Sequence, residues 1–453
     1  MSTPSFDPFF YTPSQLRDMS HRLIDMAHDL GASDAAAEVS EQSGLTVTVR
    51  MGQLETIERT RDKSAGITVY QGHRRGHATT SDLSEAALRD TVRRAFEIAR
   101  HTAEDPFSGL PDADEIARDH ASLDLFYPWS IDAQAATALA LKAESAARGA
   151  SPLIANSEGA SVSASHGQFH AANSRGFSGG YPYSRHWLSV APIAQRGEQM
   201  QRDDWYTTSR NAVHLADPEA VGLYAARRAL SRLGARQLPT GEHPVIFEAP
   251  LAVGLMGSLV NALSGSSLYR KASFLVDSLG QPLFPSHISM TEDPFVPGGD
   301  GSTPFDDEGV RVQPRTVIEQ GRVAGYFLST YSARKLGMKT TGNAGGAHNL
   351  VLQSSETRPS RGLGEMIQDM GRGLLVTEVM GQGVNGLTGD YSRGAFGYWI
   401  ENGEIQHPVE EVTIAGNLKT MYAGIRGIGS DTITRGTRTT GSIWIDRMMI
   451  AGG

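Results

Sequence analysis

The high glycine content is the sequence feature that most limits which folds this chain can adopt, since glycine occupies 50 of the 453 positions. That share is about 11%, against a usual ~7%. Many glycines form clusters, at 298–301, 342–346 and 381–386. Between them lie short strand-like segments, such as Val310–Val312 and Leu374–Met380. Because Gly adopts the backbone angles that tight turns require, this arrangement predicts a β-rich fold with many turns.

Helical periodicity is clearest in the first half of the chain. Thr12-Pro13 forms a helix start, and large apolar residues then recur every three or four positions until Gly31. A second amphipathic helix is predicted over 84–102, where Asp82 and Glu85 have the spacing of a capping box. Two more helices are predicted, over 130–148 and from Asp217-Pro218 to Leu233.

Strand patterns occupy the regions between these helices. Segments 45–49, 54–58 and 66–70 predict a hairpin with a neighbouring strand, and residues 153–209 predict a series of short strands. The whole pattern predicts an α+β fold, in which N-terminal helix and strand units precede a large β-rich C-terminal domain.

Three domains are expected from these patterns: an α+β domain at 1–120, a second α+β domain at 121–234, and a β-rich domain at 235–453. The spacing of strands and glycine turns in the third is typical of a β-sandwich or barrel-like domain.

Charge and cysteine content exclude several classes of protein. The chain carries 41 Lys and Arg against 50 Asp and Glu, so its net charge is 41 − 50 = −9. This balance argues against a nucleic-acid partner, because binding to phosphates depends on Lys and Arg. The chain has no cysteine, which excludes disulfides, thiolate nucleophiles and any zinc site that uses cysteine.

No membrane or secretory segment is predicted. Residues 1–11 lack the basic and apolar regions of a secretory signal. The uncharged stretch 249–269 is about as long as a membrane span, but it contains Pro250, Asn261 and several serines, so a buried core helix is expected instead. We therefore expect a cytoplasmic protein.

Two glycine motifs match known fingerprints without the context that those fingerprints need. The sequence Gly381–Gly386 fits the dinucleotide motif G-x-G-x-x-G, but two further glycines follow and no helical pattern does. The sequence Gly176–Gly180 fits the nucleophile-elbow motif G-x-S-x-G, but Tyr181-Pro182 cannot readily begin the required helix, and nothing in the sequence assigns His186 as a base. Both are predicted to be glycine-rich loops.

Metal-binding patterns are equally weak. The pairs His73/His77 and His166/His170 have helical chelate spacing but lie in turn and strand contexts, so surface or sheet histidines are expected. The acidic cluster 300–308 lacks the spacing of an EF-hand and is predicted to be a solvated turn. None of the 14 histidines is followed by Glu, so the zinc-peptidase signature H-E-x-x-H is absent.

Several longer strings resemble one known family. They are Gly66–Tyr70, Tyr331–Met338, Thr341–Gly346, Gly373–Gly383, Gly389–Gly394, Glu401–Glu404 and Pro408–Asn417. Over essentially the whole chain the sequence resembles the PmbA (TldE) branch of the TldD/PmbA family of cytoplasmic metallopeptidases, once described as modulators of DNA gyrase.

The resemblance implies a zinc site in the other branch of the family and none in this chain. In the TldD branch, an H-E-x-x-x-H helix and a later cysteine hold zinc. That helix would correspond to Gly254–Leu263 here, which has neither His nor Glu, and the cysteine segment would correspond to Thr434–Ser442. The resemblance therefore implies a subunit without catalytic or metal-binding residues of its own, whose TldD-type partner carries the zinc.

The implied substrates are unfolded or short peptides, including peptide-toxin precursors and antitoxins. Strand addition and the glycine loops are expected to let a peptide backbone approach closely. The expected peptide-binding residues are Gly342, Asn343, Gly345, Gly346, Gly381 and Gly383.

Two alternatives stay open at this point. The chain could be a metallopeptidase that draws His, Asp or Glu ligands from distant segments, or a regulator that binds a toxin, an antitoxin or gyrase. A homodimer of the isolated chain is a further possibility.

Overall fold

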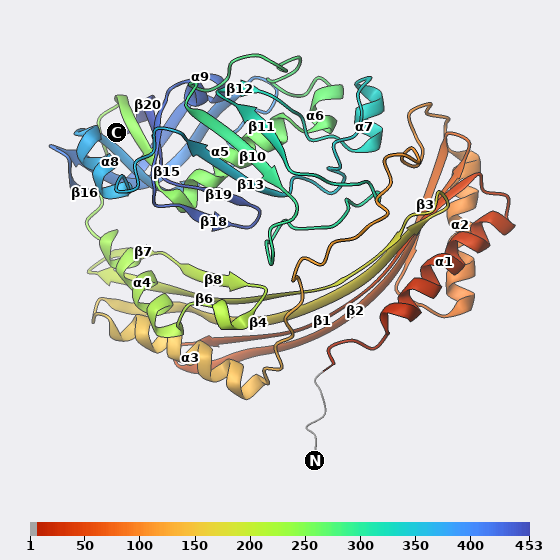
Figure 1. Ribbon diagram of the computed structural model, residues 1–453. Helices are drawn as coiled ribbons and strands as arrows, with labels where there is room; N and C mark the ends of the chain where they lie inside the picture. The colour runs from red at the N-terminus through yellow and green to blue at the C-terminus, as the bar shows by residue number, and fades with distance from the viewer. Residues whose placement is uncertain (1–6) are drawn as a thin grey trace. The chain divides into compact units, whose positions relative to one another are not determined.

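A computed structural model describes residues 7–453, and its contacts divide the chain into two compact units (Figure 1). The first, here the N-terminal unit, extends to Leu233 and includes Glu308–Arg311. The second, here the C-terminal unit, comprises Gly234–Asp307 and Val312–Gly453. Both contain helices and sheets, so the predicted α+β class is confirmed.

The N-terminal unit is built on one eight-stranded sheet of order β3-β2-β1-β4-β6-β7, with β5 paired to β4 and β8 paired to β6. Its neighbouring strands are antiparallel. The strands are β1 (Asp34–Arg50), β2 (Gln53–Gln71), β3 (Arg74–Thr80), β4 (Ile154–Asn173), β5 (Ser178–Gly179), β6 (Pro182–Arg196), β7 (Gln199–Arg202) and β8 (Trp205–Ser209).

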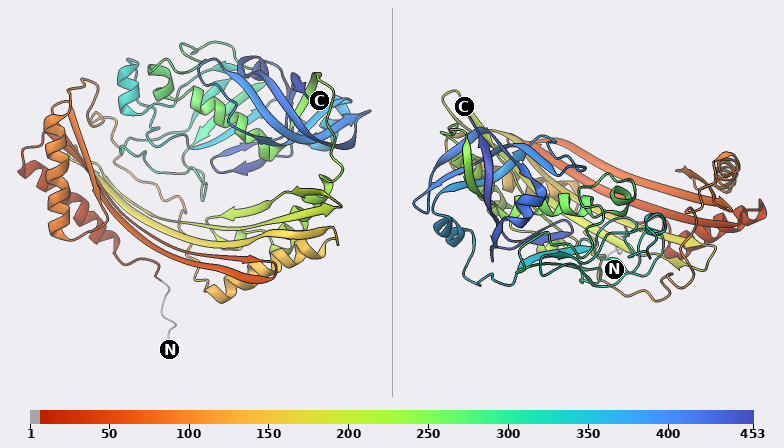
Figure 2. Two further views of the ribbon diagram at one scale, coloured as in Figure 1. Left: turned by 180° about the vertical axis from the view of Figure 1, so that it is seen from behind. Right: turned by 90° about the horizontal axis from the view of Figure 1, so that it is seen from above.

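Four long helices pack on this sheet, two near each end of its long strands (Figure 2). They are α1 (Pro13–Asp29), α2 (Glu85–His101), α3 (Ala133–Gly149) and α4 (Pro218–Ser231), with a short 3₁₀ helix at Ala212–His214. Apolar residues of α1 and α2 form one core with the sheet, and alanine-rich faces of α3 and α4 form another. Strands β1 and β4 contribute residues to both cores. The predicted three-domain division stays a prediction.

The helix starts follow the sequence closely. The Thr12 side chain accepts from the backbone of Gln15 in a capping box, and Pro13 is the first helical residue. Asp217 likewise caps α4. The predicted capping box of the second helix is wrong: Ser84 is the N-cap, and Asp82 accepts a hydrogen bond from the Ser84 backbone.

The strands of this unit are longer than predicted. Segments 54–58 and 66–70 belong to one strand, β2, which has 19 residues, and β4 has 20. The part of β2 from Gln53 to Ser64 is exposed throughout. Residues 59–64, which join the two predicted segments, are all polar and lack the alternation of apolar and polar residues by which a strand is recognised in a sequence.

The C-terminal unit contains two six-stranded sheets. One has the order β12-β11-β10-β13-β19-β18 and the other β16-β15-β14-β9-β20-β17. In the second sheet β20 also pairs with β16, so five strands close into a ring, in agreement with the predicted barrel-like domain. The strands are β9 (Gly241–Phe247), β10 (Ile288–Asp293), β11 (Arg315–Glu319), β12 (Arg322–Val323), β13 (Asn349–Ser354), β14 (Gly373–Met380), β15 (Asp390–Glu401), β16 (Glu404–Asn417), β17 (Ile425–Ile428), β18 (Ile433–Arg435), β19 (Arg438–Thr440) and β20 (Ile443–Ala451).

The uncharged stretch 249–269 forms two helices that meet at Leu263-Ser264. The buried face of the first, α5, joins the main core of this unit. Among the described residues, no helix combines the length and apolar character that crossing a membrane requires. The helices of this unit are α5 (Ala249–Ala262), α6 (Gly265–Tyr269), α7 (Thr330–Lys335), α8 (Leu363–Met370) and α9 (Leu418–Ala423).

Candidate functional site

The glycine loop 342–346 lies between α7 and β13, and its conformation requires glycine. Gly342, Gly345 and Gly346 have φ values of 70°, 92° and 124°, which residues with a side chain rarely adopt. Asn343, in contrast, is only 6% exposed. The loop therefore combines an unusual backbone with one buried polar anchor.

The Asn343 side chain ties this loop to the neighbouring strands. Its amide nitrogen donates to a carboxylate oxygen of Glu292 at 2.8 Å and to the backbone carbonyl of Gly346 at 3.0 Å. Its amide oxygen accepts from the Thr341 hydroxyl at 2.7 Å and from Arg315 at 3.1 Å. Both ends of the side chain are thus satisfied within the chain.

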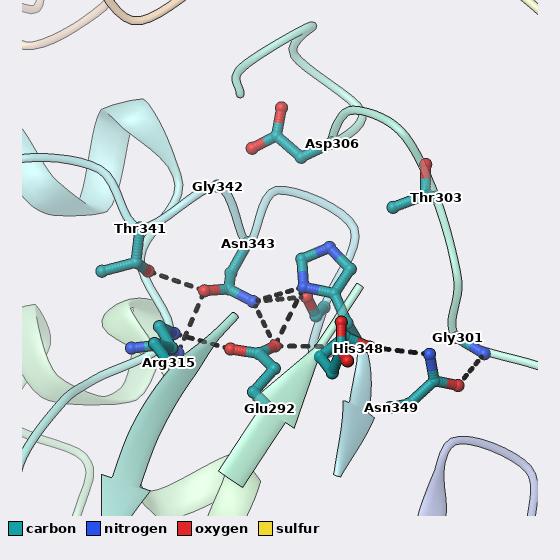
Figure 3. Close-up of polar contacts among 12 residues, drawn as sticks. Glu292, Gly301, Thr303, Asp306, Arg315, Thr341, Gly342, Asn343, His348 and Asn349 are labelled. Atoms are coloured by element: carbon teal, nitrogen blue, oxygen red, sulfur yellow. Dashed lines mark hydrogen bonds and ion pairs between the residues drawn. The ribbon is translucent and has the colours of Figure 1, made fainter. Parts of the chain in front are cut away.

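Glu292 of β10 is the centre of this network and is 1% exposed (Figure 3). Arg315 lies 2.6 Å from one carboxylate oxygen. The backbone and the imidazole Nδ1 of His348 lie 2.8 and 3.0 Å from the other. Burial on its own raises the pKa of Glu292, but hydrogen bonds from His348 and the charge of Arg315 outweigh burial and lower the pKa to about 2. The carboxylate is therefore ionised at neutral pH, with a partner on each oxygen.

A second loop, 298–307, is held to the same network. Asn349 accepts from the backbone of Gly301 at 2.9 Å and donates to the Ser302 hydroxyl at 2.8 Å. Asp306 is 3% exposed and accepts from the backbone of Ala344 at 3.0 Å. The predicted solvated turn is therefore wrong for Asp306, because this carboxylate fastens one loop to the other.

Space around the glycines of loop 342–346 is uneven. A Cβ at Gly345 would lie 2.4 Å from the Asp307 carboxylate, so the chain itself uses the close approach that this glycine permits. No atom of the described chain lies within 4 Å of the corresponding point at Gly346. Peptide binding by this loop remains a prediction.

The loop Gly381–Gly386 joins β14 to β15, and β15 rather than a helix follows it, as predicted. The Gly383 carbonyl accepts from the Ser392 backbone at 2.7 Å, and a Cβ at Gly383 would lie 1.5 Å from the Ser392 oxygen. Gly381 has φ 81° and open space around it. Here too one glycine serves the chain's own packing, and peptide binding remains a prediction.

Helix α5 presents a face of small residues away from the core. Gly254 and Asn261 are exposed, and Gly257 and Ser258 are half-buried. The far end of this face approaches the second glycine loop, since the Asn261 amide is 3.9 Å from the point where a Cβ on Gly386 would lie.

The hairpin of β18 and β19 lies against the same helix. Ser442, just beyond the hairpin, accepts from the backbone of Ala249 at 3.0 Å and donates to Asp431 at 2.6 Å. These bonds fasten the hairpin to the start of α5. Arg438 of β19 lies over the helix, with a guanidinium nitrogen 3.1 Å from where a Cβ on Gly257 would stand. The structure thus brings together the two segments, 254–263 and 434–442, that the family resemblance singled out.

Arg438 has no counter-charge among residues 7–453. Its guanidinium makes no hydrogen bond or ion pair with any described residue, and its Nε is buried. Burial lowers the pKa of Arg438, but an arginine stays protonated at neutral pH. Thr440, two residues along the strand, is 0% exposed, and its hydroxyl has no partner in the described chain. Because strand side chains alternate, both residues belong to the same face of β19.

The residues at α5 and the hairpin do not fit a zinc ion. Zinc in proteins takes Cys, His, Asp or Glu ligands. Segments 254–263 and 434–442 offer none of these, and Arg438 adds a positive charge beside the helix. Within residues 7–453, no group of three or more such side chains has an arrangement that could hold a metal.

The N-terminal unit contains a histidine cluster that the sequence did not reveal as such. The Ser178 hydroxyl of the G-x-S-x-G loop lies 3.0 Å from His21 and 3.3 Å from His170, whose other ring nitrogen is 2.8 Å from Ser20. Burial, assisted by the nearby His21, lowers the pKa of His170 to about 4. The loop prediction holds, because β5 and β6 rather than a helix follow Gly176.

His166 and His186 lie side by side in the same unit, with ring centroids 5.4 Å apart. His166 Nε2 accepts from the Trp129 backbone at 3.0 Å, and burial lowers the pKa of His166 to about 4, with a further contribution from His186. Since β4 contains His166 and His170, the predicted sheet histidines are confirmed for this pair.

Comparisons with known proteins agree over nearly the full chain. Three family models match: PmbA/TldA metallopeptidase domain 1 at residues 35–99, the central domain at 126–233 and the C-terminal domain at 240–452. The chain is 46% identical to the metalloprotease PmbA of Escherichia coli O157:H7, with 93% of each chain covered. It is 44% identical to a PmbA homologue from Haemophilus influenzae, covering 97% of this chain and 96% of the relative.

Solved structures show the same fold. A candidate modulator of DNA gyrase from Bacteroides thetaiotaomicron superimposes with a TM-score of 0.91 at 24% identity, covering 98% of this chain and all of that one. TldE from Thermococcus kodakarensis superimposes with a TM-score of 0.82 at 21% identity, covering 96% of this chain and all of that one.

Proposed function

This chain belongs to the PmbA branch of the PmbA/TldD metallopeptidase family, and from that premise we propose that it is the non-catalytic subunit of a cytoplasmic zinc peptidase complex. The TldD-type partner supplies the zinc and the residues that polarise the peptide bond. The substrates are unfolded or short peptides.

One observation carries the proposal: the chemistry of the residues at α5. A metallopeptidase needs ligands for the metal and a base for the water that attacks the peptide bond. Over 254–263 this helix has glycine, serine, asparagine and apolar residues. The guanidinium of Arg438, from the adjoining hairpin, packs against it. An arginine in such a place disfavours a divalent cation and favours an anion.

The C-terminal unit offers a means of holding an extended peptide without regard to its sequence. Strand β18 is the last strand of its sheet and pairs with β19. An edge strand presents backbone groups to which a peptide can add as a further strand. The Glu292 network supports this role by fixing the loops that precede β13, the neighbour of β19.

The test is to mix the purified chain with the TldD-type protein of the same organism and to follow both size-exclusion elution and peptide cleavage. We expect a complex that contains both chains and cleaves unfolded peptides faster than either chain alone. If no complex forms and the partner cleaves equally well without this chain, the proposal fails. Chelator-sensitive cleavage by this chain alone would instead support the rival assignment as a peptidase in its own right.

A further inference from the structure

We propose that Arg438 is a carboxylate-binding residue, and that its ligand is a carboxylate group of the peptide that the complex processes. The inference rests on the proposed function for the identity of the ligand. The carboxylate belongs either to the C-terminus of the peptide or to an Asp or Glu side chain, and the chemistry that recognises it is the same in both cases.

The first step of the argument is electrostatic. A partly buried cation without a counter-ion is costly to the folded protein. The other partly buried arginines near Asp203 show the usual remedy, since Arg228 and Arg232 both lie 3.3 Å from that carboxylate. Arg438 has no such partner among the described residues. A ligand carboxylate would supply the missing charge.

The second step concerns access to the guanidinium. Gly257 is the helix residue under Arg438, and even a methyl group there would come within 3.1 to 3.6 Å of the two terminal nitrogens and the central carbon. Because Gly257 has no side chain, the guanidinium can lie against the helix without a steric clash. The terminal nitrogens are free to donate two parallel hydrogen bonds, which is the geometry that arginine uses with carboxylates.

The third step is the surroundings. Next along β19 on the same face, the buried hydroxyl of Thr440 has no hydrogen-bond partner in the described chain. No acidic residue lies in segment 254–263 or 434–442 to compete for the arginine. A cation and an unused hydroxyl beside an uncharged helix form a site that suits an anion with hydrogen-bonding oxygens.

The test uses the full chain and three fluorescently labelled alanine-based pentapeptides. One has a free C-terminus and no acidic side chain, one has a C-terminal amide and no acidic side chain, and one has a C-terminal amide and a single Glu. Fluorescence anisotropy gives the affinity of each. We expect one or both carboxylate peptides to bind on the order of tenfold more tightly than the uncharged amide. The stronger of the two identifies the source of the carboxylate.

Arg438→Gln is expected to abolish this preference, whereas Arg447→Gln should preserve it. Arg447 is exposed and pairs with Glu242 in the same unit, so the control removes the same charge. The inference is wrong if the wild-type chain shows no preference for a carboxylate, or if Arg438→Gln retains the wild-type preference.

A matched pair of glycine variants tests the geometry without changing any charge. Gly257→Ala places a methyl group against the guanidinium, whereas Gly254→Ala places one in open space on the same helix. Both substitutions favour the helix similarly. We expect Gly257→Ala to reduce the carboxylate preference several-fold and Gly254→Ala to leave it unchanged. Equal preferences in the two variants would contradict the proposed orientation of Arg438.

These measurements separate the inference from the proposed function. They use this chain alone, so a chain that binds no TldD-type partner could still show the carboxylate preference. Conversely, a complex that forms and cleaves peptides while the preference is absent would overturn only the role of Arg438.

Discussion

Two charged side chains of the C-terminal unit are shielded from water, but only one of them has charge partners within the described chain. Glu292 is buried among donors, with Arg315, His348 and Asn343 around its two oxygens. Arg438 is half-buried against a helix, with no charge opposite it in the described chain. A buried charge whose partners are all internal maintains the structure. A charge left without a partner can bind something from outside.

The comparison also distinguishes the two parts of the predicted peptide-binding set. Asn343 and the glycines beside it belong to the internally satisfied network. The loop Gly381–Gly386 approaches α5, and the guanidinium of Arg438 from β19 packs over the same helix. If peptides bind to this unit, the second region has the unused hydrogen-bonding groups to receive them.

The largest effect is expected from Glu292→Ala. Removal of this carboxylate leaves the largely buried Arg315 without its charge partner, which typically costs about 3–5 kcal/mol in the free energy of unfolding. Urea unfolding should show this loss in the free energy of unfolding. Glu404→Ala, at an exposed position of the same unit, is the control and should change stability by less than about 0.5 kcal/mol. Equal effects of the two variants would show that Glu292 does not hold the fold.

The next largest effect is expected from Gly345→Ala, for which Gly381→Ala is the control. Both glycines have similar positive φ values, 92° and 81°, so both substitutions strain the backbone by about 1 kcal/mol. Only at Gly345 does the new methyl group meet a carboxylate, that of Asp307. Thermal unfolding should therefore show that Gly345→Ala lowers the free energy of unfolding by about 2–3 kcal/mol, against about 1 kcal/mol for Gly381→Ala. If Gly381→Ala is as harmful, that loop is constrained in a way the structure does not show.

The two units are expected to lose stability at different pH. The folded pKa of His166 is about 4, below its ordinary 6.5, so the unfolded chain binds more protons between these values. This contribution is complete above pH 6.5 and is lost as the pH falls toward 4. Glu292 has a folded pKa of about 2 against an ordinary 4.5, so its contribution is lost only between pH 4.5 and 2.

Hydrogen exchange, corrected for its intrinsic pH dependence, can follow β4 and β10 separately. We expect the free energy of opening of β4 to fall by on the order of 1–3 kcal/mol as the pH falls from 7 to 5, while that of β10 is unchanged. His166→Gln should reduce the response of β4, because glutamine can still accept from the Trp129 backbone without binding a proton. Simultaneous loss in both strands would contradict the assignment.

The smallest effect on stability is expected from Arg438→Ala. No ion pair with a described residue is broken, so the free energy of unfolding should change by less than about 1 kcal/mol, whereas Arg315→Ala should cost about 3–5 kcal/mol. Urea unfolding of the two variants side by side measures the difference. A large loss on Arg438→Ala would assign this arginine to the scaffold.

Local sequence signals predicted the starts of two helices correctly. Thr12-Pro13 and Asp217-Pro218 begin α1 and α4, because capping depends on residues within one turn. The continuity of β2 was not predicted, since residues 59–64 between its two predicted segments are polar and exposed and show no alternation.

The Glu292 network could not be predicted from the sequence. Its acid, its arginine and its histidine are up to 56 residues apart and come together only through the pairing of β10 with β11 and β13. Arg438 was equally hidden, because its lack of a partner depends on what surrounds it in three dimensions. Of the features at α5 and the adjoining hairpin, the sequence showed only that His, Glu and Cys are absent from the expected positions.

The central claim is that this chain serves a peptidase without holding its metal, and zinc analysis tests it most directly. The chain and the proposed TldD-type partner should be purified separately and together. The zinc content and the peptidase activity of each preparation should then be measured. We predict zinc in stoichiometric amount in the partner and in the complex, and no stoichiometric zinc in this chain. Stoichiometric zinc in the isolated chain, with cleavage that a chelator stops, would contradict the account.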